Sequence, residues 1–492
     1  MQYFCASKPT YLVLIIQQVK MSHTKVIATL GPTSGDIDIM RKLFKAGVNV
    51  CRLNFSHGSQ EQQGQRIQNV IELNKELSTN VTILADLQGP KLRIGEVENN
   101  GVMLEDGREV DFITTPVLGT SKELYMSYTE FPKDVEKGEF ILIDDGKIKL
   151  EVLETNGIDR VRTRVIHGGL LSSKKGVNLP NTNVSLPSLT EKDMQDAIYA
   201  LSHNVDWIAM SFVRSAKDIK PLRELIHAEK KSVRIIAKIE KPEALNDLDA
   251  IIDVYDGIMV ARGDLGVEIP FDRVPMIQKM IVKKCIEKGK PVIIATQMLE
   301  SMITNFSPTR AEANDVANAV LDGADAVMLS AETSAGRYPL ESVLAMRQII
   351  SWTETNGFKY NREILPDINS KTFLADTICI NACRMASQSN AKAIVVFTYS
   401  GYTAMRIASL RPEAEIFVFT SNQLLVRKMA LVWGMHAYYS NDIDNIDYAI
   451  EQSIISLKKR GYVIDEDIVV HVGSTPFEVK GKTNMIKLSR VS

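Results

Sequence analysis

Short, uniformly apolar runs alternate with amphipathic stretches through the first two thirds of the chain. Uniform rather than alternating hydrophobicity is typical of parallel strands that are covered on both faces. The intervening stretches, such as Asp36–Ala46 and Pro275–Lys288, have the pattern of crossover helices. Eight such βα units predict an α/β fold built on a (β/α)8 (TIM) barrel. The expected strands are Lys25–Gly31, Val48–Ser56, Val81–Gln88, Asp206–Phe212, Arg234–Glu240, Gly257–Asp264, Pro291–Met298 and Ala326–Thr333.

The alternation is interrupted between the third and fourth runs. From about Gly89 to Leu186 the chain carries strands and glycine turns, with little helical periodicity. This predicts a β-rich domain inserted at the carboxyl-terminal mouth of the third strand, a suitable place for a lid. After Asn356 a second α/β series begins, which we interpret as a separate domain. Its expected strands lie near Ala393–Thr398, Ile416–Thr420 and Ile468–Val472.

The length of 492 residues is too great for one core and predicts about three domains. We divide the chain into an N-terminal extension (1–20), the barrel (21–88 and 187–350), an inserted β-barrel lid (89–186) and a C-terminal α/β regulatory domain (357–492). The apolar run Tyr11–Ile16 is much shorter than a membrane span and lacks a small-residue cleavage site. We therefore expect no membrane association and no chemical role for the extension.

Charge and cysteine content narrow the possible partners. The chain has 58 Lys+Arg and 60 Asp+Glu, a net charge of -2. This balance gives no global attraction to nucleic acid, so any anion binding must be local. The five cysteines form no zinc-type pairs and suit the reducing cytoplasm.

Polar residues gather at the carboxyl ends of the expected strands. In a barrel these ends meet at one face, where active sites are built. One polar residue at a strand end is ordinarily a loop or cap residue, but repetition at most of the strands favours a site. The residues concerned are Arg52, Asn54, Ser56, Asp86, Lys238, Glu240, Arg262, Gly263, Asp264, Thr296, Gln297, Ser330 and Glu332.

Lys238 and Glu240 are two residues apart, so they share one face of their strand. They could form a simple ion pair. They could also supply a cation for a transferring phosphoryl group and a carboxylate for a metal. Asp264, at the mouth of the next strand, offers a second carboxylate, and two carboxylates plus substrate oxygens commonly hold Mg²⁺. Gly263 and Asp264 also open a short helix, where free N–H groups bind anions.

Four longer motifs are similar to signatures of the pyruvate kinase family. They occur in family order and at family spacing, and the resemblance extends from Met21 over nearly the whole remaining chain. The motifs are Val50–Gly58 (VCRLNFSHG), Ala237–Glu240 (AKIE), Met259–Gly266 (MVARGDLG) and Ala295–Met302 (ATQMLESM). The resemblance implies transfer of a phosphoryl group from phosphoenolpyruvate to ADP, giving pyruvate and ATP in the last step of glycolysis. It also implies Mg²⁺ (or Mn²⁺), a mobile lid and a cytoplasmic homotetramer.

The resemblance assigns roles to individual residues. Lys238 would stabilise charge on the phosphoryl group in flight, and Glu240 and Asp264 would ligate Mg²⁺. Backbone N–H groups of Gly263 and Asp264 would hold the substrate carboxylate. Thr296 would lie beside the methylene carbon that is protonated. Phosphoryl transfer depends mainly on positioning and charge neutralisation, which this set supplies.

Further roles fall on the remaining strand ends and on the lid. Thr296 would either deliver the proton or order a water near Ser330, an alternative that the sequence leaves open. Arg52 and Arg93 would contact the transferring phosphate. The expected nucleotide contacts are Asn54, Phe55, Ser56, His57, Arg93 and Lys175.

One segment departs from the commonest family pattern. Many members continue after the aspartate as Thr-Lys-Gly-Pro-Glu and hold K⁺ nearby, whereas this chain has Leu87-Gln88-Gly89-Pro90-Lys91 after Asp86. It resembles the branch in which a lysine ammonium takes the place of K⁺. Loop drift is the alternative, but several positions change together. We therefore expect no K⁺ requirement, with Lys91 replacing the ion among Asn54, Ser56, Asp86 and Leu87.

The segment Thr398–Thr403 (TYSGYT) follows an expected strand and precedes a helix. Its hydroxyl and N–H groups could form a phosphate cradle or a plain helix cap. By resemblance it is an effector site formed by Thr398, Ser400, Gly401 and Thr403. Gly473–Asn484 lacks the Trp and Arg that some members use for a second phosphate. A sugar or nucleotide monophosphate is therefore the expected effector.

Two other functions compete with this one. Another enolate enzyme on a Mg²⁺ barrel, such as an aldolase, would need neither the inserted domain nor Lys175. A catalytically silent metabolite-binding regulator would be expected to have lost Lys238, Glu240, Asp264 or Thr296, and all four are present.

Overall fold

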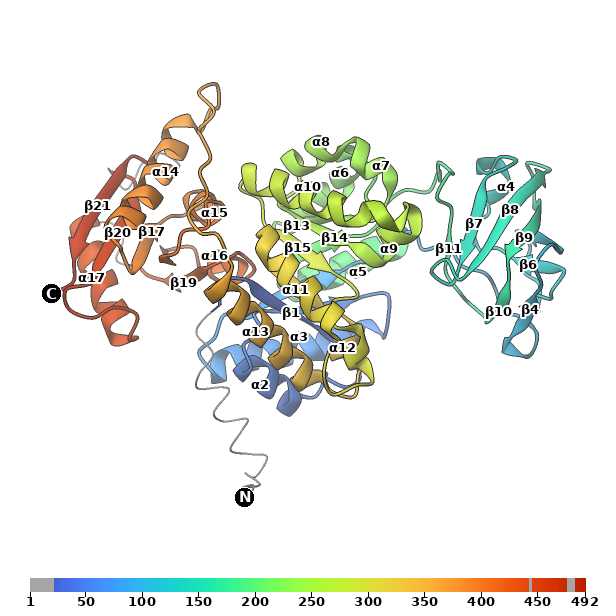
Figure 1. Cartoon of the computed structure of the whole chain (residues 1–492), viewed down its shortest axis with the longest axis horizontal. Helices are drawn as coiled ribbons and strands as arrows, with labels where there is room; N and C mark the ends of the chain where they lie inside the picture. The colour runs from blue at the N-terminus through green and yellow to red at the C-terminus, as the bar shows by residue number, and fades with distance from the viewer. Residues whose placement is uncertain (1–21, 442–444, 476–482) are drawn as a thin grey trace, which may run out of the picture.

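The computed structural model describes residues 22–441, 445–475 and 483–492. The predicted extension, 1–20, lies outside the described residues. Three bodies lie in a row, with the barrel in the middle, the strand-rich domain at one end and the C-terminal domain at the other (Figure 1). Within the described residues, no helix is both long and apolar enough to cross a membrane.

The central body is a closed, eight-stranded parallel barrel, as predicted. Its strands follow the order β1-β16-β15-β14-β13-β12-β3-β2. Closure comes from β1, which pairs with β2 on one side and with β16 on the other. The strands are β1 (Lys25–Leu30), β2 (Val50–Asn54), β3 (Thr82–Asp86), β12 (Trp207–Met210), β13 (Arg234–Ile239), β14 (Gly257–Ala261), β15 (Val292–Ala295) and β16 (Ala326–Leu329).

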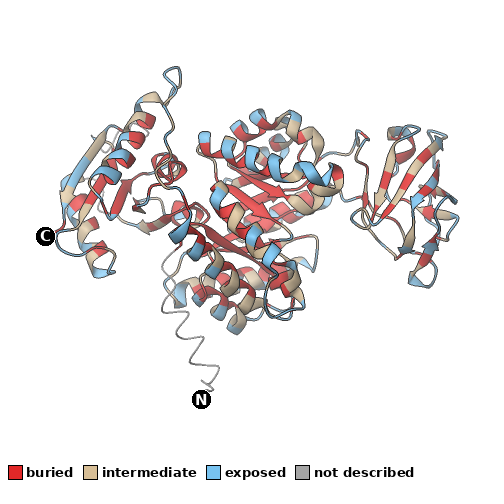
Figure 2. Ribbon diagram, viewed as in Figure 1, coloured by how far each residue is buried: buried red, intermediate tan, exposed pale blue. Residues whose placement is uncertain are grey.

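The barrel has an inner core and an outer one. Inward-facing side chains such as Trp207, Met259 and Met328 fill the interior, while a larger cluster packs the strands against the helices. The strands are accordingly buried (Figure 2), except that Asn54 at the end of β2 and Arg234 at the start of β13 are half-buried. The outer helices include α2 (Ile37–Lys45), α3 (Gln60–Glu76), α5 (Glu191–Ser202), α6 (Lys220–Ala228), α7 (Pro242–Asn246), α8 (Leu248–Val254), α10 (Val274–Glu287), α11 (Arg310–Asp322), α12 (Ala331–Ser334) and α13 (Pro339–Asn356). Side-chain caps fix several starts, including the Ser59 capping box of α3.

The strand-rich domain leaves the barrel after β3 and returns before α5, again as predicted. Its main sheet has the order β11-β7-β8-β9-β5-β6, with β10 and β4 as a separate pair. It has its own core around Phe112, Phe131 and Leu150. Its strands are β4 (Val102–Leu104), β5 (Glu109–Ile113), β6 (Glu123–Tyr125), β7 (Phe140–Ile143), β8 (Ile148–Thr155), β9 (Arg160–His167), β10 (Gly169–Leu171) and β11 (Val177–Asn178), with the short helix α4 (Phe131–Asp134).

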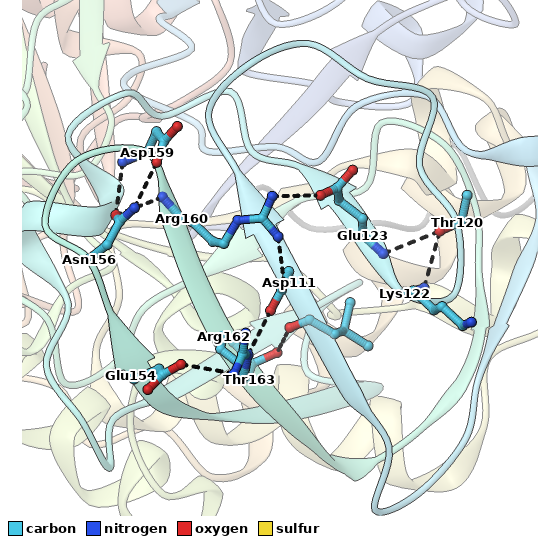
Figure 3. Close-up of polar contacts among 11 residues, drawn as sticks. Asp111, Thr120, Lys122, Glu123, Glu154, Asn156, Asp159, Arg160, Arg162 and Thr163 are labelled. Carbon is cyan, nitrogen blue, oxygen red and sulfur yellow. Dashed lines mark hydrogen bonds and ion pairs between the residues drawn. The ribbon is translucent and has the colours of Figure 1, made fainter.

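Ion pairs cross the outer face of this sheet. Arg160 pairs with Asp111 at 2.6 Å and with Glu123 at 3.1 Å, while Arg162 pairs with Asp111 at 3.3 Å and with Glu154 at 3.0 Å (Figure 3). Because both arginines are nearly half exposed, each pair stabilises the sheet by about 1 kcal/mol or less.

The C-terminal domain is a five-stranded sheet in the order β19-β18-β17-β20-β21, in which β21 alone runs antiparallel to its neighbour. The three predicted strands appear as β17 (Ala393–Phe397), β18 (Glu415–Thr420) and β20 (Ile468–Gly473). Sequence reasoning missed β19 (Met435–Tyr439) and β21 (Met485–Arg490), whose polar residues mask the strand pattern. The helices are α14 (Phe373–Gln388), α15 (Tyr402–Ser409), α16 (Gln423–Met429) and α17 (Ile446–Lys459).

This domain packs against the amino-terminal end of the barrel. Arg411 forms a buried pair with Asp325, just before β16, at 2.8 Å, and Arg427 pairs with Asp206, just before β12, at 2.9 Å. The lysine at the start of β1, Lys25, donates to the carbonyl of Met435 at 3.1 Å. The carboxyl-terminal mouth of the barrel is therefore the end that faces away from the C-terminal domain.

Candidate active site

Three barrel strands bring charged side chains into contact at the mouth. Arg52 Nε of β2 lies 2.7 Å from Asp86 Oδ2 of β3. Lys238 Nζ of β13 lies 3.3 Å from Asp86 Oδ1 and 2.9 Å from Glu240 Oε1. The predicted convergence of these four residues is therefore present, and each is at least nine-tenths buried.

Burial and charge act in opposite directions on this cluster. Burial alone would raise the pKa of Asp86, but the Lys238 and Arg52 cations outweigh it and hold that pKa low. Burial alone would lower the pKa of Lys238, but Asp86 and Glu240 outweigh it and raise that pKa. Lys238 therefore presents a firmly charged ammonium in a site of low dielectric, where a cation acts most strongly on a transferring phosphoryl group.

Neighbouring groups that sequence reasoning missed hold this cluster in place. Lys238 Nζ donates to Ser211 Oγ at 2.7 Å, and Ser211 Oγ donates to the Leu87 carbonyl at 2.7 Å. Arg52 Nη1 donates to Thr29 Oγ1 at 3.0 Å. Both hydroxyl residues lie at the carboxyl ends of barrel strands, which was the available signal. Neither was singled out because a lone hydroxyl there is indistinguishable from a cap.

The helix α9 (Arg262–Glu268) starts directly after β14 and faces Thr296. The Gly263 N–H donates to Thr296 Oγ1 at 2.7 Å. A β-carbon on Gly263 would lie 3.3 Å from that oxygen, so glycine permits the close approach. Thr296 and Gln297 both have left-handed backbones, with φ of 68° and 55°. Such strain is stored most often at functional sites.

Arg262 fixes the other side of this turn. Its guanidinium pairs with Asp315 at 2.7 Å and donates to the Thr296 carbonyl at 2.8 Å. Ser330 is held by Glu332, whose carboxylate accepts from the Ser330 N–H at 2.7 Å and from the Leu299 N–H at 3.1 Å. Thr296 and Ser330 thus line one rim of the mouth, and the contacts of Arg262 and Glu332 hold their backbone in place.

Two carboxylates at the mouth fit a divalent cation. Glu240 Oε2 accepts from the Phe212 N–H at 2.7 Å, which aims the carboxylate group. Burial raises the pKa of Glu240, Lys238 opposes this, and the nearby Asp264 carboxylate adds to it. Among the described residues, Asp264 has no ion-pair partner. Two close carboxylates that repel each other form a hard oxygen donor set suited to Mg²⁺.

A cavity of about 890 Å³ opens at the mouth beside Asp264, while Glu240 and Lys238 are not among its lining residues. Its lining includes Lys91, Asp264, Thr296 and Ser330 from separate strand ends. The volume lies within the usual range for small-molecule sites.

Of the residues at the end of β2 that were expected to contact the nucleotide, only some have side chains available for it. Asn54 Oδ1 accepts from the Ser56 N–H at 3.0 Å. Phe55 is buried and offers only backbone, its carbonyl accepting from Lys192 Nζ at 2.9 Å. Burial and then the cations Arg93, Lys91 and Arg52 lower the pKa of His57. His57 therefore lies within a local positive field, as an anion site requires.

The lid residues make their contacts within the lid. Arg93 Nη1 donates to the Lys174 carbonyl at 2.9 Å, and Lys175 Nζ pairs with Asp144 at 2.8 Å. The lid does reach the mouth elsewhere, because its residue Asp145 lines the same cavity as Asp264 and Thr296 (the lid is the strand-rich body in Figure 1). Neither side chain touches the Lys238 cluster, so their expected roles require the lid to close.

The structure corrects one expectation about Lys91. We expected its ammonium to neutralise Asp86, but the partners of Asp86 are Arg52 and Lys238. Lys91 is exposed and lines the mouth with Gly263 and Asp264. Two closer cations already neutralise the buried carboxylate, although its Oδ1 has no hydrogen-bond partner among the described residues.

The predicted effector loop is a turn between β17 and α15. Gly401 has a φ of 87°, and its N–H donates to Thr398 Oγ1 at 3.0 Å. Ser400 is exposed, whereas Thr403 is buried and its hydroxyl lies 2.6 Å from that of Thr483. The loop thus presents Ser400 outward, but Thr403 points inward, away from a free cradle.

Two family models match the chain. One, described as the barrel domain of pyruvate kinase, covers residues 21–343, and the other, described as its alpha/beta domain, covers 376–489. The pyruvate kinase of Geobacillus stearothermophilus is 43% identical over 476 residues, which cover 95% of this chain and 80% of that relative. The pyruvate kinase of Clostridium acetobutylicum is 40% identical over 474 residues, which cover 96% of this chain and all of that relative (100%).

A solved structure gives the same result. The crystal structure of a pyruvate kinase from Cryptosporidium parvum superposes with a TM-score of 0.90 at 33% identity, covering 99% of this chain and 100% of that chain. Sequence and structure agree over the barrel, the inserted domain and the C-terminal domain, and the chain belongs to the pyruvate kinase family.

Proposed function

We propose that the chain transfers the phosphoryl group of phosphoenolpyruvate to ADP with the help of a divalent cation. The observation that carries this proposal is the buried Lys238 ammonium, 2.9 Å from Glu240 and 3.3 Å from Asp86, at a mouth that Asp264 also faces. A cation aimed at a transferring phosphoryl group beside two metal-binding carboxylates is the arrangement that such a transfer requires.

Each group has a distinct task in this proposal. Glu240 and Asp264 would hold Mg²⁺ (or Mn²⁺), which supplies charge neutralisation between the two reactants. Lys238 would stabilise the phosphoryl group, and Thr296 would stand near the carbon that gains a proton. The N–H groups of Gly263 and Asp264 would orient the substrate carboxylate, that of Gly263 after release from Thr296 Oγ1. Lid closure would bring Arg93 and Lys175 to the phosphates and exclude water.

A coupled assay tests the proposal directly. Pyruvate should form from phosphoenolpyruvate only when ADP and Mg²⁺ are both present. An aldolase-type enzyme would need no nucleotide, and a silent regulator would bind phosphoenolpyruvate without turning it over. Either of those outcomes would overturn the proposal.

We expect full activity without K⁺, because Lys91 places a fixed positive charge on the rim of the mouth. Its location on the rim, close enough to Arg52 and Arg93 to act with them on His57, supports this role. Turnover in buffer free of K⁺ and NH₄⁺ should match turnover in about 100 mM KCl at the same ionic strength. Lys91→Glu should then create a K⁺ requirement. Tenfold or greater activation of the parent by K⁺ would contradict this expectation.

The effector loop is tested by removing its hydroxyl groups. Ser400→Ala with Thr403→Ala should abolish activation by sugar or nucleotide monophosphates and leave basal turnover unchanged, because the loop lies beyond the opposite end of the barrel. Since Thr403 is buried against Thr483, Ser400→Ala alone should account for most of the loss. If no such phosphate activates the parent enzyme, the loop is a helix cap only.

A further inference from the structure

A buried carboxylate joins the base of the lid to the helix that starts the substrate site. Glu268 ends α9, the helix that begins with Arg262, Gly263 and Asp264. Its side chain is only 1% exposed. Glu268 Oε1 accepts from two donors, Lys241 Nζ at 2.6 Å and Asn178 Nδ2 at 2.8 Å.

The two donors come from different bodies. Lys241 directly follows Glu240, the expected metal ligand, after β13. Asn178 belongs to β11, the lid strand at the barrel side of the domain (Figure 1). One carboxylate oxygen therefore connects three pieces: the end of β13, the helix α9 and the lid.

The lid side of this contact is continuous with the lid residues expected to reach the nucleotide. Lys175 lies three residues before Asn178, and Gly176, between them, forms a β-bridge with Arg93. The lid turn containing Gly146 also approaches α9, because a β-carbon there would lie 3.8 Å from Val267 Cγ1. The position of Asn178 thus sets where the lid segment that carries Lys175 meets the barrel.

The environment indicates a functional contact rather than incidental packing. Lys241 is 11% exposed, so the pair with Glu268 is well shielded from water. Glu268 Oε2 is buried and has no hydrogen-bond partner among the described residues. An unsatisfied buried acceptor is costly, and native proteins rarely keep one without a reason. A cavity at the lid base is lined by Asn178 and Lys241 together with Lys91 and Asp264, so the contact adjoins the proposed site.

We propose that Glu268 is a positioning residue whose bond to Asn178 seats the lid on the substrate helix. The inference rests on the proposed function, since it gives the lid the task of delivering Arg93 and Lys175. Through Lys241 the same carboxylate fixes α9 relative to β13. Glu268 would therefore hold the proposed metal ligands on the barrel and the proposed phosphate contacts on the lid in a fixed relative position. Small misplacements of such groups cost large factors in rate.

Asn178→Ala removes only the lid-side donor and keeps the Lys241–Glu268 pair. We expect kcat/KM for ADP to fall about tenfold, because groups carried by the lid lose their position. Binding of phosphoenolpyruvate in the presence of Mg²⁺ and without ADP should change less than about twofold, since its contacts are on the barrel. Arg160→Ala, in the ion pairs on the outer face of the lid, is the matched control and should behave as the parent.

Exchanging the carboxylate and the amide between residues 178 and 268 distinguishes a positioning role of this contact from a general loss of packing. Asn178→Asp places a second carboxylate against Glu268 and should lower kcat/KM for ADP by about a hundredfold. Adding Glu268→Gln to Asn178→Asp again leaves one carboxylate and one amide beside Lys241. The carboxylate is now on residue 178 and the amide on residue 268. The double variant should recover to within about threefold of the parent. Failure of this rescue, or parental kcat/KM for ADP in Asn178→Ala, would overturn the proposal.

Hydrogen exchange gives a readout that does not depend on activity. Backbone amides of residues 172–184 should exchange faster in Asn178→Ala than in the parent or in Arg160→Ala, while barrel strands stay unchanged. Equal exchange in all three proteins would also overturn the proposal. If instead the parent formed no pyruvate but the exchange difference appeared, the proposed function would fail and the structural link between lid and helix would stand.

Discussion

Lys238→Met is expected to lower turnover by about a thousandfold or more, equivalent to roughly 4 kcal/mol of transition-state stabilisation. The ammonium is buried, and Asp86, Glu240 and Ser211 hold it in one position. A preorganised cation in a site of low dielectric acts most strongly on charge that develops during the reaction. Steady-state kinetics should show the loss in kcat, with a much smaller change in the binding of phosphoenolpyruvate.

Lys25→Met is the matched control for this variant. Lys25 is also a buried strand lysine, but it lies at the opposite end of the barrel and donates to Met435. Because Lys25 lies away from the mouth, Lys25→Met also removes a buried lysine but should leave turnover near the parental value. If Lys238→Met retained more than about a tenth of the parental turnover, its assigned role would be wrong.

Glu240→Gln or Asp264→Asn should raise the Mg²⁺ concentration needed for half-maximal activity by about tenfold or more. Each change removes one of the two carboxylates proposed to hold the ion, and an amide oxygen is a weaker ligand for a hard cation. The measurement is a metal titration at saturating phosphoenolpyruvate and ADP.

Asp272→Asn provides the comparison for these two variants. Asp272 follows α9 closely in the chain, but it is exposed and lies outside the proposed metal site. Its titration should overlay that of the parent. A titration of Glu240→Gln or Asp264→Asn that also overlaid the parent would remove that residue from the proposed metal site.

The barrel and the core of its site could be predicted because two simple rules apply to them. Uniformly apolar runs marked the strands, and the topology of a closed parallel barrel forces their carboxyl ends together. Arg52, Asp86 and Lys238 are far apart in the chain, yet these rules place all three at the same mouth. The resemblance to pyruvate kinases then supplied the roles.

The remaining features depend on contacts that no local pattern encodes. Ser211 and Thr29 support the charged cluster, but hydroxyls at strand ends are common. Lys91 lies on the rim of the mouth rather than against Asp86, whose partners here are Arg52 and Lys238. Lys175 pairs with Asp144 within the lid, a contact between residues far apart in the chain that no local pattern predicts.

Closure of the barrel has a consequence for the order in which the chain folds during synthesis. Register pairs Lys25 with Ala326, so the first strand cannot complete its ladder until the eighth has been made. The inserted domain is continuous in sequence and has its own core, so it can form while five of the eight barrel strands are still missing. Until the later strands are synthesised, the first three barrel strands have uncovered apolar faces and unpaired edges. They are therefore the segment most prone to aggregate during synthesis.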